Sequence, residues 1–300
     1  MFKVLRTKSL VRGFHGYLFS GKLVKTIVVR RLPELAELFK PTAGSAPKLI
    51  HVSPLFKRSS GGVKCIYSYA MCNNSEVIKC SKPITPIELN GSYDFYMGFT
   101  DSVLSLVKAI EALSSIDECF EFMKQEVCVT VQEVEYIDAR ALAREIVNRV
   151  IEVGRVKVVF ASPTMLRDPL RRSKYKSFSP TPFNVFSTPT YILQYISGGY
   201  SPRRLRLHLT ILHRLLNETY SITGTTRVKW ILYGRSPEPT LVGYVNYHLN
   251  KDYVEQYSRV LSINEYLTEV FAASIALGVG VGRTAGFGHV FIEPGAVEST

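Results

Sequence analysis

Five glycines fall within eleven residues near the C-terminus of the chain, in the segment Gly278–Gly288 (GVGVGRTAGFG). Glycine adopts positive φ without strain, and its backbone can approach a phosphate closely. The segment follows a helical pattern and leads into a strand pattern. The phosphate loops of Rossmann and P-loop proteins instead follow a strand and open a helix, so those folds are excluded. Arg283, at the centre, predicts an anion site of another kind.

A helix is expected directly before this segment. Ser262 and Glu265 have the spacing of a capping box, and the apolar residues that follow share one helix face. A last strand is expected at 289–293. The glycine-rich segment therefore joins a well-defined helix to a strand.

Hydrophobic periodicity predicts an α+β chain with a repeated order of elements. In the first half, strands are expected at 2–11, 48–56, 62–69, 91–99 and 120–136, and helices at 17–31, 33–39 and after a cap at Asp101. In the second half, strands are expected at 155–161, 227–233, 240–247 and 289–293, and helices at 190–196, 202–217 and before Gly278.

This order is that of the ferredoxin-like split βαβ arrangement. We predict two tandem ferredoxin-like domains, each an antiparallel sheet with helices on one face. The first spans 1–137, a linker helix spans 138–154, and the second domain spans 155–300.

Composition narrows the class of partner. The 300 residues include 37 Lys+Arg and 25 Asp+Glu, a net charge of +12, which favours a polyanion such as nucleic acid. No apolar run approaches the roughly 20 residues that span a bilayer, so no membrane partner is expected. The five cysteines show no CxxC pair, which argues against a zinc ribbon. Their odd number argues against a disulfide framework and predicts reduced thiols in a cytoplasm.

The glycine pattern resembles the signature of RAMP proteins, the repeat-associated RNA-binding proteins of CRISPR systems. Gly280, Gly282, Gly286 and Gly288 match the form GxGxxxxxGhG, although the second and third glycines lie closer together here. Within that superfamily the chain is similar to the repeat-processing endoribonuclease. The similar segments are 48–56 (KLIHVSPLF) and 156–166 (VKVVFASPTML).

The resemblance implies two ferredoxin-like domains with a basic cleft between them. It also implies cleavage of CRISPR repeat RNA by attack of a 2′-hydroxyl on the adjacent phosphate, without a metal or other cofactor. The products would carry a 2′,3′-cyclic phosphate and a 5′-hydroxyl. The sequence shows no carboxylate constellation with the spacing of a two-metal nuclease. Some relatives pair, so a monomer or a homodimer is expected.

Many members of that family use a histidine in the loop after the first helix, and the counterpart here, 40–47, contains none. His51 is close and is a candidate catalytic residue, although a histidine within a strand more often packs than catalyses. Members without the histidine use lysines, and the matching positions here are Lys22, Lys25 and Lys48. Their ammonium groups would stabilise the phosphorane, and one with a lowered pKa would transfer a proton.

A basic stretch at 167–176 (RDPLRRSKYK) is expected to contact RNA, because cations bind phosphates and a tyrosine stacks on a base. The expected RNA-binding residues are Arg167, Arg171, Arg172, Lys174, Tyr175, Gly280, Gly282, Arg283, Gly286 and Gly288. The arginines of 201–214 are more typical of a solvated helix face.

Two alternatives remain open on the sequence. A non-catalytic RAMP subunit of a CRISPR effector complex would share the fold, the glycines and the charge, and the missing loop histidine favours it. The SPLF and SPT segments favour the nuclease. A basic RNA-binding protein of the translation machinery fits the ordered two-domain pattern less well.

Overall fold

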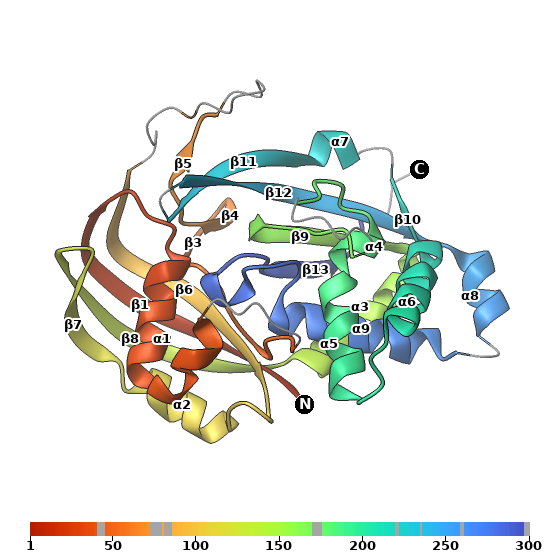
Figure 1. Cartoon of the computed structure of the whole chain (residues 1–300), viewed down its shortest axis with the longest axis horizontal. Helices are drawn as coiled ribbons and strands as arrows, with labels where there is room; N and C mark the ends of the chain where they lie inside the picture. The colour runs from red at the N-terminus through yellow and green to blue at the C-terminus, as the bar shows by residue number, and fades with distance from the viewer. Residues whose placement is uncertain are drawn as a thin grey trace.

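The computed structural model describes residues 1–40, 46–72, 80, 86–169, 176–219, 222–234, 236–258 and 261–296. Two antiparallel sheets lie side by side, and helices pack against one side of each (Figure 1). The expected fold class, two tandem ferredoxin-like units, is confirmed.

The first sheet has the strand order β4-β3-β6-β1-β8-β7, and β2 also pairs with β6. Its main strands and helices follow one another in the β-α-β-β-α-β order of a ferredoxin-like unit. The elements are β1 (Phe2–Gly16), α1 (Gly21–Arg31), η1 (Pro33–Phe39), β2 (Ile50–Val52), β3 (Phe56–Ser59), β4 (Gly62–Cys65), β6 (Ile87–Thr100), α2 (Leu106–Ser114), β7 (Asp117–Phe122) and β8 (Gln125–Asp138).

The second sheet has the order β13-β9-β12-β11-β5, and β10 pairs with β12. Its main strands repeat the same ferredoxin-like order. The elements of this half are α3 (Ala139–Val153), β9 (Arg155–Thr164), α4 (Pro182–Val185), α5 (Ser187–Ile196), α6 (Pro202–Leu215), β10 (Leu216–Glu218), α7 (Ile222–Thr225), β11 (Thr226–Tyr233), β12 (Ser236–Leu249), α8 (Lys251–Tyr257), α9 (Ile263–Leu277), η2 (Arg283–Ala285) and β13 (Val290–Pro294).

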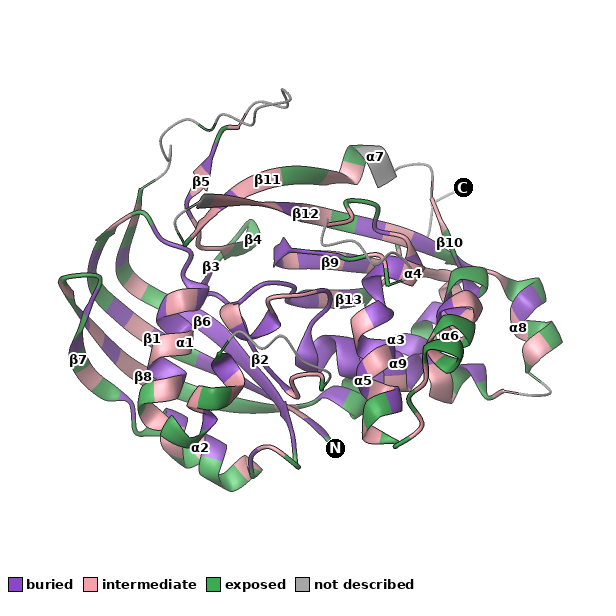
Figure 2. Ribbon diagram, viewed as in Figure 1, coloured by how far each residue is buried: buried purple, intermediate pink, exposed green. Residues whose placement is uncertain are grey.

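Alternation along β1 divides its side chains between two cores. Leu5 and Val11 pack with the helices α1 and α2 in a core of the first unit, whereas Phe2 and Val4 join the core of the second unit. The helix α9 is buried along most of its length (Figure 2). It contacts β1, β6 and β13, so it lies between the two sheets.

The two halves are also joined through their strands. The short strand β5 (Tyr69–Ala70) comes from the first half of the chain but pairs with β11, at the edge of the second sheet. The strand β5 and the β1 side chains that pack in the second core thus cross the expected boundary between the two domains. The expected ranges 1–137 and 155–300 remain our proposal for the two domains.

The expected single strand 120–136 is wrong, because the chain forms a hairpin. The strands β7 and β8 are joined at Met123 and Lys124, which have φ of 53° and 64°. Two-residue hairpin turns with positive φ favour Asn and Gly, so Met-Lys gives no turn signal.

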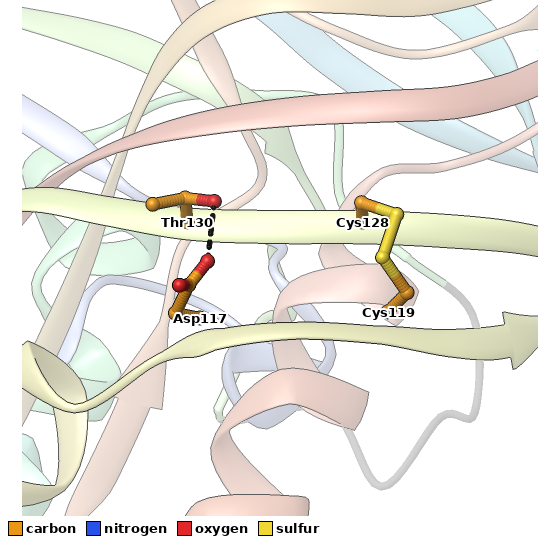
Figure 3. The surroundings of a disulfide bond; sticks show 4 residues. All are labelled: Asp117, Cys119, Cys128 and Thr130. Atoms are coloured by element: carbon orange, nitrogen blue, oxygen red, sulfur yellow. Dashed lines mark hydrogen bonds between the residues drawn. A yellow bond between two sulfur atoms is a disulfide. The ribbon is translucent and has the colours of Figure 1, made fainter.

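The hairpin also overturns the expectation that the cysteines are reduced. It places Cys119 directly opposite Cys128, and the two form a disulfide (Figure 3). On the same two strands, Thr130 Oγ1 donates to Asp117 Oδ1 at 2.8 Å. A second disulfide joins Cys72 and Cys80.

Helix starts were predicted unevenly. Asp138 caps α3 by accepting from the backbone N–H groups of Arg140 and Ala141, as a residue of that type should. Asp101 does not cap α2, since Ser105 occupies that position and accepts from Lys108 N. Ser262 precedes α9 as expected, but within the described residues its side chain forms no capping hydrogen bond. Glu265 instead forms an ion pair with Arg140.

Candidate functional site

The glycine-rich segment lies at the junction of the two sheets. Its backbone bonds to the chain that ends β9: Val281 N donates to Met165 O at 2.9 Å, and Gly288 N donates to Pro163 O at 3.1 Å. All five glycines have positive φ, between 69° and 101°. A Cβ at Gly280 would overlap the Met165 carbonyl oxygen, and one at Gly288 would overlap that of Val279. Close backbone packing at the junction accounts for these two glycines.

Arg283 does not face the surface, which contradicts the expected phosphate contact. Its side chain is buried, and the guanidinium donates to Leu277 O at 2.7 Å and to Lys48 O at 2.8 Å. Burial lowers its pKa to about 10, so the group stays charged at neutral pH. The guanidinium therefore ties the end of α9 to the chain before β2. Arg283 therefore has a structural role in the glycine-rich segment.

His51 is fully buried, so an RNA cannot reach it in this conformation and the expected catalytic role does not fit. Its Nδ1 lies 2.8 Å from Arg283 O, so Nδ1 must be the protonated nitrogen that donates to this carbonyl. The Nε2 then accepts from His289 Nδ1–H at 3.1 Å. Both rings are thus neutral, and they connect β2 to the strand that follows the glycine-rich segment. No sequence pattern marked His289 for a role.

Acid is expected to destabilise the protein through this pair. Burial lowers the pKa of His289 to about 3, and burial, His289 and Arg283 hold the pKa of His51 well below 6.5. The unfolded chain therefore binds more protons below pH 6.5, and the free energy of unfolding falls as the pH falls. At pH 5 the loss should be about 2 kcal/mol for His289, and the lowered pKa of His51 adds to it.

Chemical denaturation at pH 7.5 and pH 5 measures this loss. The double variant His51→Gln/His289→Gln should lose less stability on acidification than the wild type. His15→Gln, which changes an exposed histidine, should behave like the wild type. An equal loss in all three proteins would contradict the assignment.

The three expected lysines are all placed around the glycine-rich segment. The helix α1 begins against this segment, since a Cβ at Gly21 would overlap the Ala285 carbonyl oxygen. Lys22 follows directly, and its Nζ lies 4.9 Å from the ring centroid of Tyr233. Lys48 is linked to the segment through its own carbonyl, which accepts from Arg283.

The ammonium groups of Lys25 and Lys48 meet at the end of η1. Lys25 Nζ donates to Phe39 O at 2.9 Å, and Lys48 Nζ donates to the next carbonyl, that of Lys40. The carbonyls of two consecutive residues thus hold two ammonium groups close together, although their positive charges repel. We call Lys22, Lys25 and Lys48 the lysine cluster.

Burial lowers the pKa of every member of the lysine cluster. The positive charges of Lys25 and Arg283 lower the pKa of Lys48 further. Among the described residues, no carboxylate acts on the pKa of these lysines. Partly desolvated cations without a counter-charge attract an anion strongly, and a lowered pKa brings an ammonium nearer to proton transfer at neutral pH.

A groove lined by aromatic and basic side chains lies between the sheets. Its volume is about 630 Å³, and its walls include Lys64, Tyr67, Tyr69 and Lys229. Lys229 Nζ lies 5.1 Å from the ring centroid of Tyr69 and 5.9 Å from that of Tyr67. The sequence did not single out these residues, because the pairing of β5 with β11 that brings them together is not visible in a linear pattern.

This groove and the lysine cluster are connected along β11. Lys229 and Tyr233 both lie on this strand, and Tyr67, Tyr69 and Tyr233 pack on one small apolar cluster. Tyr233 in turn contacts Lys22. Cations and aromatic rings thus alternate from α1 to the groove, an arrangement typical of surfaces that bind single-stranded nucleic acid.

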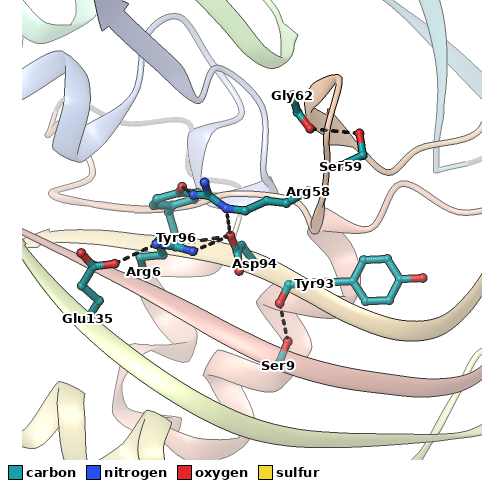
Figure 4. Close-up of polar contacts among 9 residues, drawn as sticks. All are labelled: Arg6, Ser9, Arg58, Ser59, Gly62, Tyr93, Asp94, Tyr96 and Glu135. Atoms are coloured by element: carbon teal, nitrogen blue, oxygen red, sulfur yellow. Dashed lines mark hydrogen bonds and ion pairs between the residues drawn. The ribbon is translucent and has the colours of Figure 1, made fainter.

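A carboxylate network fixes the hairpin β3–β4 on the first sheet (Figure 4). Asp94 is buried, and Arg6 and Arg58 both pair with its Oδ2. Arg58 also donates to the Tyr96 hydroxyl at 3.2 Å, and Arg6 pairs with Glu135 at 2.9 Å. These arginines have carboxylate partners, unlike the lysine cluster, so we assign them to structure.

The expected basic stretch begins beside the glycine-rich segment. Met165 forms a β-bridge with Val281, and Leu166 forms one with Ser177. Arg167, the next residue, is exposed. Arg171, Arg172, Lys174 and Tyr175 lie outside the described residues. The RNA contacts of this stretch remain a proposal.

Among the described residues, no group of three or more His, Cys, Asp or Glu side chains is placed to hold a metal ion. In the same part of the chain, no helix is long and apolar enough to cross a membrane.

No protein-family model matches the sequence, and no curated protein sequence matches it. Solved structures do match. A Cas6 product complex has a TM-score of 0.60 at 15% identity, covering 97% of this chain and 100% of that one. Thermus thermophilus Cas6 has a TM-score of 0.52 at 14% identity, with coverage of 97% and 98%. A RAMP protein binding different RNA substrates has 0.50 at 11%, with coverage of 97% and 99%.

The matched structures cover nearly the whole chain, so the likeness includes both sheets and the helix α9 between them. The fold is therefore that of the RAMP proteins. Within that class, the chain has the fold of Cas6.

Proposed function

We propose that the chain is an endoribonuclease that cleaves precursor CRISPR RNA within its repeats. The observation that carries the proposal is the lysine cluster, three half-buried cations without a carboxylate partner among the described residues, packed beside the glycine-rich segment. The fold shared with a Cas6 product complex supports RNA cleavage as the activity.

The proposed reaction needs no group beyond RNA and side chains. The 2′-hydroxyl of one nucleotide loses its proton to a base and attacks the adjacent phosphorus. The P–O5′ bond then breaks, and the 5′ oxygen takes a proton from an acid. The products are a 2′,3′-cyclic phosphate and a 5′-hydroxyl. A lysine with a lowered pKa serves as base, and the other ammonium groups stabilise the charge of the phosphorane.

We propose that RNA enters along the strip formed by Tyr67, Tyr69, Lys229 and Tyr233, with bases on the rings and phosphates near the cations. The exposed Arg167 would extend this path. Arg171, Arg172, Lys174 and Tyr175 stay predicted RNA contacts. Repeat RNA is thus the proposed partner. The protein would bind it as a monomer or as a homodimer.

We expect the affinity for repeat RNA to depend on the aromatic rings of this strip. Tyr69→Ala should weaken binding of repeat RNA by roughly 1–3 kcal/mol, because one stacking surface is lost. Tyr17→Ala, which removes an exposed tyrosine away from the groove lining, should leave the affinity unchanged. Filter binding with an RNA that carries a 2′-deoxy nucleotide at the cleavage site measures affinity without cleavage. Equal losses in both variants would contradict the assignment of the groove.

A second function, RNA holding without cleavage, is favoured by one observation. His51 is buried and supplies no surface base, and Lys25 and Lys48 are occupied by backbone carbonyls. In that case the protein would be an RNA-binding subunit of a CRISPR effector complex.

Product analysis separates the two functions. Purified protein is incubated with labelled repeat RNA from its source genome and with a scrambled RNA of equal length. The nuclease predicts one cut in the repeat, with a 5′-hydroxyl that polynucleotide kinase labels without prior phosphatase treatment. Retention of repeat RNA without a cut would support the holding function instead.

A further inference from the structure

A second cavity lies on the helical face of the second unit, away from the lysine cluster. It has a volume of about 520 Å³, within the range of small-ligand sites. It is bounded by α5, α6 and α9, and Leu193, Ile196 and Leu261 give it largely apolar walls. No member of the lysine cluster or of the aromatic groove lines it.

Two polar side chains on one face of α5 are buried in its wall. Thr190 and Gln194, one helical turn apart, are 1% and 5% exposed. The hydroxyl of Thr190 and both the nitrogen and the oxygen of the Gln194 amide have no hydrogen-bond partner among the described residues. Buried polar groups are nearly always satisfied, so three unmatched atoms at one cavity require an explanation.

A bound ligand with a complementary edge provides that explanation. A glutamine amide presents a donor beside an acceptor, and it pairs with a planar group that presents an acceptor beside a donor. Adenine does so through N7 and the N6 amino group. The apolar walls and the ring of Tyr266, which lies 5.6 Å from that of His208, offer flat contacts for the faces of a base.

The rim of the cavity suits the phosphate of a nucleotide. Arg204 lines the cavity and is exposed, with one nitrogen donating to Gly199 O at 3.1 Å. The carboxylates of Glu265 and Glu269 also line it, but Arg140 pairs with both and Arg144 pairs with Glu265. Two guanidiniums thus balance the two carboxylates, and the guanidinium of Arg204 adds the positive charge that a phosphate would meet.

We propose that this cavity binds an adenine nucleotide, with the base against Gln194 and Thr190 and the phosphate toward Arg204. The same chemistry is offered by a free nucleotide and by an unpaired adenosine within a bound RNA. The site would be separate from the lysine cluster.

Calorimetry with AMP and with purine riboside 5′-monophosphate, which lacks the N6 amino group, tests the free nucleotide, using the wild type, Gln194→Leu and Gln256→Leu. Gln256 is exposed on α8 and serves as the matched control. Binding of a matched RNA pair, in which one unpaired adenosine is replaced by purine riboside, tests the RNA source. Gln194→Leu should lower affinity for the adenine ligand about tenfold, the effect of one bidentate pair. Its melting temperature should not fall, because an unsatisfied buried amide has been removed.

Each result decides the proposal. AMP binding that exceeds binding of the purine riboside nucleotide and is lost in Gln194→Leu supports it for the free nucleotide. An adenosine preference confined to RNA and lost in the same variant supports it for RNA. Gln194→Met gives a second variant if the leucine variant fails to fold. Adenine binding that is absent, or is equal in wild type and variant, overturns it. The AMP arm does not depend on RNA cleavage, so it stands or falls apart from the proposed nuclease.

Discussion

Lys22→Ala is expected to lower the single-turnover rate of repeat cleavage by about 10²–10³-fold, the usual effect of removing one group that stabilises charge in a transition state. Lys22 lies next to the glycine that packs on the Ala285 carbonyl, and its ammonium faces Tyr233. The fold should be retained, because within the described residues this ammonium has no carboxylate partner whose charge would be left unpaired.

Two further variants define the role of Lys22. Lys22→Arg keeps the charge but cannot release a proton near neutral pH, so it should retain activity if the role is electrostatic and lose it if the role is proton transfer. Lys8→Ala removes an exposed lysine from the first sheet and should cleave like the wild type. The assignment fails if Lys22→Ala and Lys8→Ala cleave equally fast.

Gly288→Ala is expected to destabilise the fold by roughly 3 kcal/mol or more, because it adds both backbone strain and an overlap in the core. Gly288 has φ of +74°, and a Cβ there would overlap the Val279 carbonyl oxygen. In thermal denaturation the melting temperature should fall by roughly 6 °C or more.

Gly198→Ala is the matched control for this variant. Gly198 has a similar φ of +67°, but no described atom lies within 4 Å of the position its Cβ would take. It should therefore lose only about 1–2 kcal/mol, the cost of the left-handed conformation alone. Equal losses at the two positions would show that packing of the glycine-rich segment contributes nothing to stability.

The fold was predictable because its main strands and helices carry regular hydrophobic patterns. The two halves show the expected repeat of ferredoxin-like elements, and the helix before the glycine-rich segment was located to the residue at Ser262. The hairpin at Met123 and Lys124 was not predictable, since neither residue type favours positive φ and the strain is borne by the pairing of β7 with β8. The disulfide between Cys119 and Cys128 depends on that hairpin and was missed with it.

The site was predicted less completely, for a different reason. The lysines were predicted because a family resemblance marked their positions, and their role stays a proposal. Arg283 and His51 have the residue types of RNA-binding and catalytic groups, yet both are buried. The His51 ring bonds to the backbone carbonyl of Arg283, and the Arg283 guanidinium bonds to the carbonyl of Lys48, just before β2. Burial of single residues between two sheets depends on how the units meet, and a linear pattern does not contain that information.

The most direct test of the central claim is cleavage of end-labelled repeat RNA in excess EDTA, beside the same RNA with a single 2′-deoxy nucleotide at each candidate position. We predict one cut that persists in EDTA and disappears when one particular nucleotide lacks its 2′-hydroxyl. Tight binding without any cut, or a cut that survives every deoxy substitution, would contradict the account.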